Sequence, residues 1–128
     1  MTIAAKTAQL TGVMAMTHVA DVDRSIEFYK KLGFTVRNTV RNGEVTNWAC
    51  LDLDGKAQLM LARSGRPMNP GAQDVLFYLY ATNVAEYREQ LQAQGIEVSE
   101  IRYPFWSPRG EFRVKDLDGW DLFISHAG

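Results

Sequence analysis

The sequence predicts an α+β fold built from two βαβββ modules, because one turn and one order of elements both occur twice. The letters D-L-D-G stand at 52–55 and again at 116–119, each time between stretches rich in apolar and aromatic residues. Asp-Gly is typical of tight hairpin turns, whose central positions need positive φ. An amphipathic helical pattern precedes each hairpin. We therefore expect paired, curved mixed sheets with a cleft between them.

The first module is expected over residues 11–63. An apolar run over 13–19 predicts its first strand. Asp21 or Asp23 can cap the helix that follows, and apolar residues recur at helical spacing until Gly33 ends it. Three further strands complete the module, the last two joined by the first D-L-D-G turn.

The second module is expected over residues 75–126 and repeats this order. Its first strand is the apolar run over 75–81, and Asn83 with Glu86 forms a capping-box-like pair at the start of a helix. Gly95 ends that helix. The chain is then expected to restart as a strand at two apolar positions, Ile96 and Val98.

Residues 64–74 are expected to link the modules, because the stretch holds two prolines and two glycines with little periodicity. About 60 residues are too few for either half to be very stable alone, so we expect a single domain over 1–128 whose halves share buried surface. Small molecules usually bind in clefts at such junctions. Two arrangements remain open: the modules pair within one chain, or they exchange across a homodimer.

Composition excludes several classes of partner. The 128 residues are 46% apolar and carry a formal net charge of −1, so no basic surface is available for nucleic acid. Apolar runs fall far short of a membrane span, and the N-terminus lacks a charged segment followed by an apolar one. We expect a cytoplasmic protein. Cys50 is the only cysteine, which excludes an intrachain disulfide, and we interpret it as a small buried apolar residue.

Two stretches carry a resemblance to a known superfamily. The first, T-H-V-A-D-V-D-R-S-I-E-F-Y-K-K-L-G-F at 17–34, resembles the opening of the glyoxalase, bleomycin-resistance and extradiol-dioxygenase (vicinal oxygen chelate) superfamily. The second, W-S-P-R-G-E-F-R-V-K-D-L-D-G-W-D-L-F-I-S at 106–125, is similar to the last hairpin of that superfamily, usually written with D-P-D-G. The superfamily contains isomerases, dioxygenases, epimerases, thiol transferases and metal-free drug-binding proteins, so membership does not identify a reaction.

The resemblance implies where a metal ion would be bound. In metal-dependent members, the first and fifth strands offer a histidine or related ligand, and the fourth and eighth offer a carboxylate. In this chain those positions correspond to Met14, Leu76 and Phe123, with Leu59 on the fourth strand if counted from the repeat, or Met60 if aligned by apolar pattern. None is a ligand for a hard or borderline cation. We therefore expect no divalent metal and no cofactor.

Strand alternation and the resemblance together suggest which side chains line the cleft. On the first strand, Met16 and His18 share the side of Met14, and the resemblance gives His18 a substrate-contacting position. An alternative is that the apolar members simply form the core between the sheets. Arg109, beside Gly110, is a candidate anion contact. The full set expected in the cleft is Met16, His18, Trp48, Tyr78, Tyr80, Trp106, Arg109, Asp121 and Phe123.

The sequence as a whole favours a metal-free binding protein of the bleomycin-resistance type, which holds an apolar or aromatic small molecule, as a homodimer. The alternative is a lyase, isomerase or dioxygenase with an unconventional or absent metal site. A relocated site of His18, Asp121 and His126 is disfavoured, because the last two have opposite parity on one strand. A structural role without a ligand is a third possibility. The residues contain no nucleophile elbow and no phosphate-binding loop.

Overall fold

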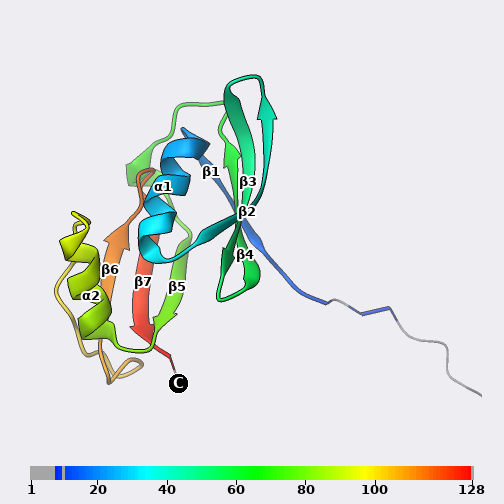
Figure 1. The fold of residues 1–128 in the computed structure, drawn as a ribbon. Helices are drawn as coiled ribbons and strands as arrows, with labels where there is room; N and C mark the ends of the chain where they lie inside the picture. Colours follow the sequence, from blue (N-terminus) through cyan, green and yellow to red (C-terminus); the bar gives the residue numbers. More distant parts are fainter. Residues whose placement is uncertain (1–7, 10, 128) are drawn as a thin grey trace, which may run out of the picture.

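A computed structural model describes residues 8, 9 and 11–127 of the chain (Figure 1). Its elements follow one another as β1 (Ala15–Val19), α1 (Val22–Leu32), β2 (Thr35–Asn42), β3 (Val45–Leu53), β4 (Lys56–Arg63), a short 3₁₀ helix η1 (Pro70–Ala72), β5 (Leu76–Ala81), α2 (Val84–Ala93), β6 (Glu111–Lys115) and β7 (Asp121–His126). No helix within this described part is long and apolar enough to cross a membrane.

Two mixed sheets confirm the predicted α+β class. The first has the order β1-β4-β3-β2 and the second has the order β5-β7-β6. In each sheet the strand before the helix pairs in parallel with the last strand of its module, and the other neighbours are antiparallel. Figure 1 shows the first sheet to the right of the second, with α2 at the left beside β6. The two halves therefore repeat one topology, except that the first sheet has four strands and the second has three.

Both helices start at the predicted caps. Asp21 is the N-cap of α1, and its carboxylate accepts the Arg24 amide at 3.1 Å. Asp23 instead accepts the hydroxyl of Thr46 at 2.8 Å, which ties α1 to β3. In α2 the side chain of Asn83 accepts the amide of the third helical residue at 3.0 Å. These local bonds satisfy amides that a helix leaves free at its first turn.

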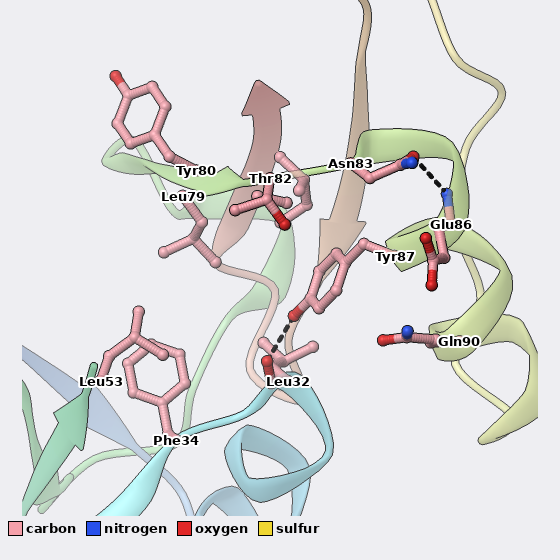
Figure 2. Close-up of a pocket in the computed structure, with 12 residues that line it drawn as sticks. Leu32, Phe34, Leu53, Leu79, Tyr80, Thr82, Asn83, Glu86, Tyr87 and Gln90 are labelled. Atoms are coloured by element: carbon pink, nitrogen blue, oxygen red, sulfur yellow. Dashed lines mark hydrogen bonds between the residues drawn. The ribbon is translucent and has the colours of Figure 1, made fainter. Parts of the chain in front are cut away.

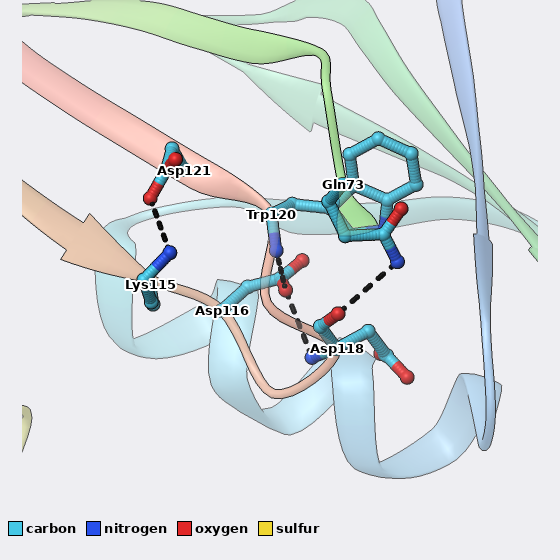
Figure 3. A network of polar contacts seen from close by, with 6 residues as sticks. All are labelled: Gln73, Lys115, Asp116, Asp118, Trp120 and Asp121. Atoms are coloured by element: carbon cyan, nitrogen blue, oxygen red, sulfur yellow. Dashed lines mark hydrogen bonds and ion pairs between the residues drawn. The ribbon is translucent and has the colours of Figure 1, made fainter. Parts of the chain in front are cut away.

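The two D-L-D-G sequences fold differently. In the first, Asp54 and Gly55 both have positive φ, 54° and 75°, and form the predicted two-residue turn between β3 and β4. The second spans the wider connection from β6 to β7. There one oxygen of Asp116 accepts the amides of Asp118 and Trp120, each at 2.9 Å (Figure 3). This carboxylate closes a longer loop, so the prediction of a tight turn holds only for the first copy.

The predicted strand at Ile96 and Val98 is wrong, because this segment is irregular and the second sheet has three strands. The segment still runs along the edge of β6: the Ser99 amide donates to the carbonyl of Arg113, and the Ser99 hydroxyl accepts the Arg113 amide at 2.7 Å. A side chain thus takes a bond that a regular ladder would give to a backbone carbonyl. Only an isolated bridge between Arg102 and Glu111 remains of the ladder.

The helix-covered faces of both sheets meet in a single core. Its buried residues come from both modules, and they include Val19, Tyr29, Leu51, Leu61, Val84, Leu91, Phe112, Leu122 and Ile124. Two buried carboxylates of the β6–β7 loop add polar bonds across this seam. The hydroxyl of Tyr29 donates to Asp116 at 2.6 Å, and the amide of Ala20 donates to Asp118 at 2.9 Å. The modules are therefore joined by both apolar and polar contacts.

Burial affects the protonation of two groups at the seam, the Asp116 carboxyl and the Tyr29 hydroxyl. Burial raises the pKa of the Asp116 carboxyl above its ordinary value, although the bonds from Tyr29 and from two backbone amides act in the opposite direction. Burial, together with the charge and the hydrogen bond of Asp116, raises the pKa of Tyr29. Tyr29 therefore remains a donor throughout the neutral range.

Replacing Tyr29 with phenylalanine should weaken the seam, because one oxygen of the buried Asp116 loses its side-chain donor. We expect the free energy of unfolding at pH 7 to fall by about 1.5–3 kcal/mol, the usual cost of losing a hydrogen bond to a charged group. Urea unfolding followed by circular dichroism measures the change. Tyr103→Phe is the control, since Tyr103 is 68% exposed and should unfold like the parent. Equal stability of both variants would contradict the assigned role.

The bond from Tyr87 to the first module predicts a loss of stability at alkaline pH. Its hydroxyl donates to the carbonyl of Leu32 at 2.6 Å, and burial raises its pKa to about 12. In the unfolded chain tyrosine ionises near pH 10. Its contribution is therefore complete below about pH 10 and is lost as the pH rises through about 12. Urea midpoints measured from pH 9 to 11.5 should fall less steeply for Tyr87→Phe than for the parent, and identical slopes would refute this.

Candidate functional site

Each sheet has one face covered by a helix and one open face. In the first sheet, Thr17, Leu59 and Leu61 are buried on the helix side, whereas Met16 and His18 are exposed on the other side. Because the helix sides of both sheets meet in one core, the open faces turn away from that core. The side chains expected in the cleft are distributed over these two open faces and one loop.

The open face of the first sheet carries an unusual number of sulfur atoms. Cross-strand register places Met60 opposite both Met16 and Cys50. The Sγ atom of Cys50 lies 4.0 Å from the Sδ atom of Met14. We call this surface the sulfur face, and it consists of Met14, Met16, His18, Trp48, Cys50, Met60 and Ala62.

The open face of the second sheet carries a row of aromatic rings. Tyr78 stacks on Phe123 with 5.4 Å between ring centroids and 21° between planes. Tyr78 and Tyr80 are 6.5 Å apart at 26°. The two tyrosines remain 40% and 66% exposed, so the row is open to a further ring. We call this surface the aromatic face, which is formed by Leu76, Tyr78, Tyr80 and Phe123.

A buried polar group borders the aromatic face at the end nearest Tyr80. Ser125 pairs with Tyr80 on one side and with Glu111 on the other, and its hydroxyl lies 2.6 Å from that of Ser107. Glu111 is only 6% exposed, and one of its oxygens accepts the indole N–H of Trp106 at 3.1 Å. A surface cavity of about 270 Å³ lies here. It is lined by Ser99, Glu100, Arg102, Glu111, Phe112, Arg113 and Phe123.

The opposite end of the aromatic face carries an exposed ion pair, unlike the end where Glu111 and the two serines are buried. Asp121 accepts from Lys115 at 2.8 Å, and the lysine side chain is 55% exposed. Such a pair contributes little stability in water. Figure 3 shows the two side chains pointing toward each other beside the β6–β7 loop. The negative charge of Asp121 is thus already matched by a neighbour.

The loop that precedes β6 presents further aromatic side chains. Phe105 is 90% exposed and packs edge-on against Trp106, with ring centroids 5.0 Å apart. The hydrogen bond to Glu111 fixes Trp106 next to the aromatic face. Arg109 is exposed in the same loop, and its predicted contact with an anion stays a prediction.

Glu111 and Ser107 were not among the residues that the sequence pattern predicted at the site. Strand parity gave no signal for Glu111, because it lies on the side of β6 that carries the exposed Arg113 and Lys115, opposite the buried Phe112 and Val114. The irregular segment before β6, which the repeat did not predict, is what buries this carboxylate.

The residues at the superfamily's metal positions do not fit a divalent cation. Met14 and Met60 lie on the sulfur face, and Leu76 and Phe123 lie on the aromatic face. Leu59, the other possible position on β4, is buried on the helix side. None of these side chains supplies an oxygen or nitrogen donor. In the part of the chain that the structure describes, no group of three or more His, Cys, Asp and Glu side chains could hold a metal ion.

The relocated site of the two histidines and Asp121 does not assemble either. His126 pairs with Ala81 on the helix side of β7, whereas Asp121 lies on the open face and His18 belongs to the other sheet. Within a single chain, the structure thus brings together two separate groups of the residues expected in the cleft. They occupy the open faces of different sheets.

A separate pocket of about 340 Å³ lies at the seam between the modules. Figure 2 shows Tyr87 reaching from α2 toward Leu32. Phe34 and Leu53 of the first module lie on the same side of the pocket as Leu32. The ring of Tyr80 points away from this pocket, although its backbone lines it. The pocket therefore belongs to the module interface and contains none of the other residues expected in the cleft.

Solved structures share this fold. A bleomycin-binding protein in complex with bleomycin has a TM-score of 0.73 and 20% identity, over 93% of this chain and 100% of that one. The antibiotic-binding protein TnmS3 from Streptomyces sp. CB03234 has a TM-score of 0.74 and 21% identity, over 95% and 100%. A bleomycin resistance determinant encoded on the transposon Tn5 gives 0.72 and 21%, over 91% and 98%.

A search of curated protein sequences gave no match. A family model, however, matches residues 13–124, a range that contains both helices and every strand except the last two residues of β7. This chain therefore belongs to the Glyoxalase/Bleomycin resistance protein/Dioxygenase superfamily.

Proposed function

We propose that this chain is a binding protein for a planar, largely aromatic small molecule, which it holds without the divalent cation of the superfamily's enzymes. The observation that carries the proposal is the row of near-parallel rings of Tyr78, Tyr80 and Phe123 on an open sheet face. A flat ligand that stacks on this row removes apolar surface from water on both partners. Each aromatic pair adds about 0.5–1.5 kcal/mol beyond its area burial.

The polar border of the aromatic face favours one kind of substituent on the ligand. Glu111 is nearly fully buried, and its carboxylate accepts a hydrogen bond from the indole of Trp106. A hydrogen-bond donor or a positive charge on the ligand would be stabilised by this carboxylate, because charge-assisted bonds are stronger when water is excluded. We therefore expect a preference for aromatic amines over the corresponding carboxylates.

A homodimer would convert the open faces into a cleft. Several large apolar side chains on these faces are exposed, among them Met16 at 49% and Leu76 at 46%. Two-fold pairing of identical chains could place one sulfur face opposite the aromatic face of the partner, since a two-fold interface brings two different patches together twice. Clefts at such junctions enclose most of a small ligand. We propose a cytoplasmic homodimer that binds its ligand there.

Neighbours of this fold support a small-molecule ligand. One is described as a bleomycin-binding protein and another as an antibiotic-binding protein. Antibiotic sequestration is accordingly one form that the proposed function takes. The chemistry of the aromatic face defines the ligand class more narrowly than this likeness does.

The test is a thermal shift screen of polycyclic aromatic amines, the matching carboxylates and saturated-ring analogues. A ligand present at 100 times its dissociation constant adds about 2.7 kcal/mol, which raises the melting temperature by several degrees. We expect shifts with the aromatic amines and none with the saturated analogues. Tyr80→Ala should weaken binding about tenfold, because stacking area and one ring pair are lost. Glu111→Gln should remove the preference for amines.

Leu117→Ala is the matched control, because Leu117 is 51% exposed beside α1 and is not one of the residues that form the aromatic face. It should bind like the parent. Dialysis against a chelator should leave binding unchanged. A stoichiometric divalent metal in purified protein, or ligand shifts that survive Tyr80→Ala unaltered, would overturn the proposal.

A further inference from the structure

The sulfur face brings together most of the chain's sulfur atoms. The sequence holds five methionines and one cysteine, and three of those methionines share this face with the cysteine. Met60 on β4 is flanked by Met16 on β1 and by Cys50 on β3. Met14, just before β1, reaches the same group through its 4.0 Å contact with Cys50. A carboxylate is absent from the residues that form this face.

We propose that the sulfur face binds one soft monovalent cation, Cu(I) or Ag(I), between the thiolate of Cys50 and the thioethers of Met14 and Met60. Thiolate and thioether ligands select Cu(I), whereas carboxylate, carbonyl and water suit the harder divalent ions. The substitutions that remove a hard-cation site thus leave a soft donor set on the same strands. This inference rests on side chains of the first sheet, whereas the aromatic ligand is proposed to stack on those of the second, although the proposed two-fold dimer brings both faces to one cleft.

The distance between the sulfur atoms of Cys50 and Met14 suits a shared cation. Metal–thiolate bonds are about 2.3 Å long, and two such bonds that meet at roughly 120° place their sulfur atoms about 4 Å apart. The thiol of Cys50 and the thioether of Met14 already stand 4.0 Å from each other. Directly opposed side chains on neighbouring strands have Cβ atoms roughly 4.5–5.5 Å apart, so Met60 is within reach as the third donor.

Charge neutralisation favours the cation over the free thiolate. Cys50 is only 6% exposed, and an isolated charge at such a position is costly. When the cation binds, the thiol proton passes to solvent and the metal takes its place: Cys–SH + Cu⁺ gives Cys–S–Cu + H⁺. No electron is transferred. The product is neutral, whereas a divalent ion would leave a buried net charge of one.

The test is an anaerobic titration of the full chain with Cu(I) in competition with a chromophoric Cu(I) chelator, repeated with Ag(I) as a redox-inert probe. We expect one equivalent of either ion to bind and Zn²⁺ to show no binding. Cys50→Ser should abolish competition with the chelator. The double variant Met14→Leu/Met60→Leu should lower the affinity at least tenfold, while conserving side-chain volume.

Met68→Leu is the matched control, because Met68 lies in the segment between β4 and η1 and belongs to no strand of the first sheet. It should bind like the parent. Tyr80→Ala should also bind Cu(I) normally, which separates this proposal from that of the aromatic ligand. Unchanged affinity in the double methionine variant would mean a lone thiol and would overturn the site.

X-ray absorption of the Cu(I)-loaded parent provides a measurement that does not depend on any variant folding. Three sulfur neighbours at about 2.3 Å are expected around the metal. A single sulfur neighbour, or oxygen and nitrogen neighbours only, would refute the assignment.

Discussion

Two buried carboxylates in one loop hold the halves of this molecule together. Asp116 and Asp118 are 6% and 5% exposed, and their side chains accept bonds from Tyr29 and from the amide of Ala20, at sequence separations of 87 and 98 residues. Burying a carboxylate is costly unless its lone pairs are satisfied. The loop therefore cannot separate from α1 without exposing unpaired acceptors. Once α1 is fixed there, the helix sides of both sheets close on one core, and the open faces have to turn outward.

Local features of the fold could be predicted because they depend on near neighbours. The caps at Asp21 and Asn83 and the turn at Asp54 and Gly55 each involve residues within a few positions of one another. The seam could not be predicted in this way, because its partners are far apart in the sequence. The missing strand after α2 had another cause: Ser99 substitutes a side-chain acceptor for a ladder bond, which a repeat of letters does not reveal.

Strand alternation predicted which side chains of the site share a face, but the sequence did not predict how the two modules pack together. Tyr78, Tyr80 and Phe123 share one face, as the period of two predicts. Glu111 was missed because its burial depends on the irregular segment and on Trp106. The choice between pairing within a chain and exchange across a dimer was left open by the sequence. In the structure the shared core directs the sulfur face and the aromatic face away from each other, and the homodimer stays a proposal.

The unequal lengths of the two D-L-D-G connections affect how such duplicated chains should be aligned. In the second half, the residue four places after the turn glycine is Phe123, which lies on the open face. In the first half, the residue at the same spacing is Leu59, which lies on the buried side. The open-face equivalent is Met60, one place further along. A one-residue offset exchanges the two faces of a strand. Alignments of the two halves, or of distant homologues, therefore need a gap within the turn, or they will assign solvent-facing roles to core positions.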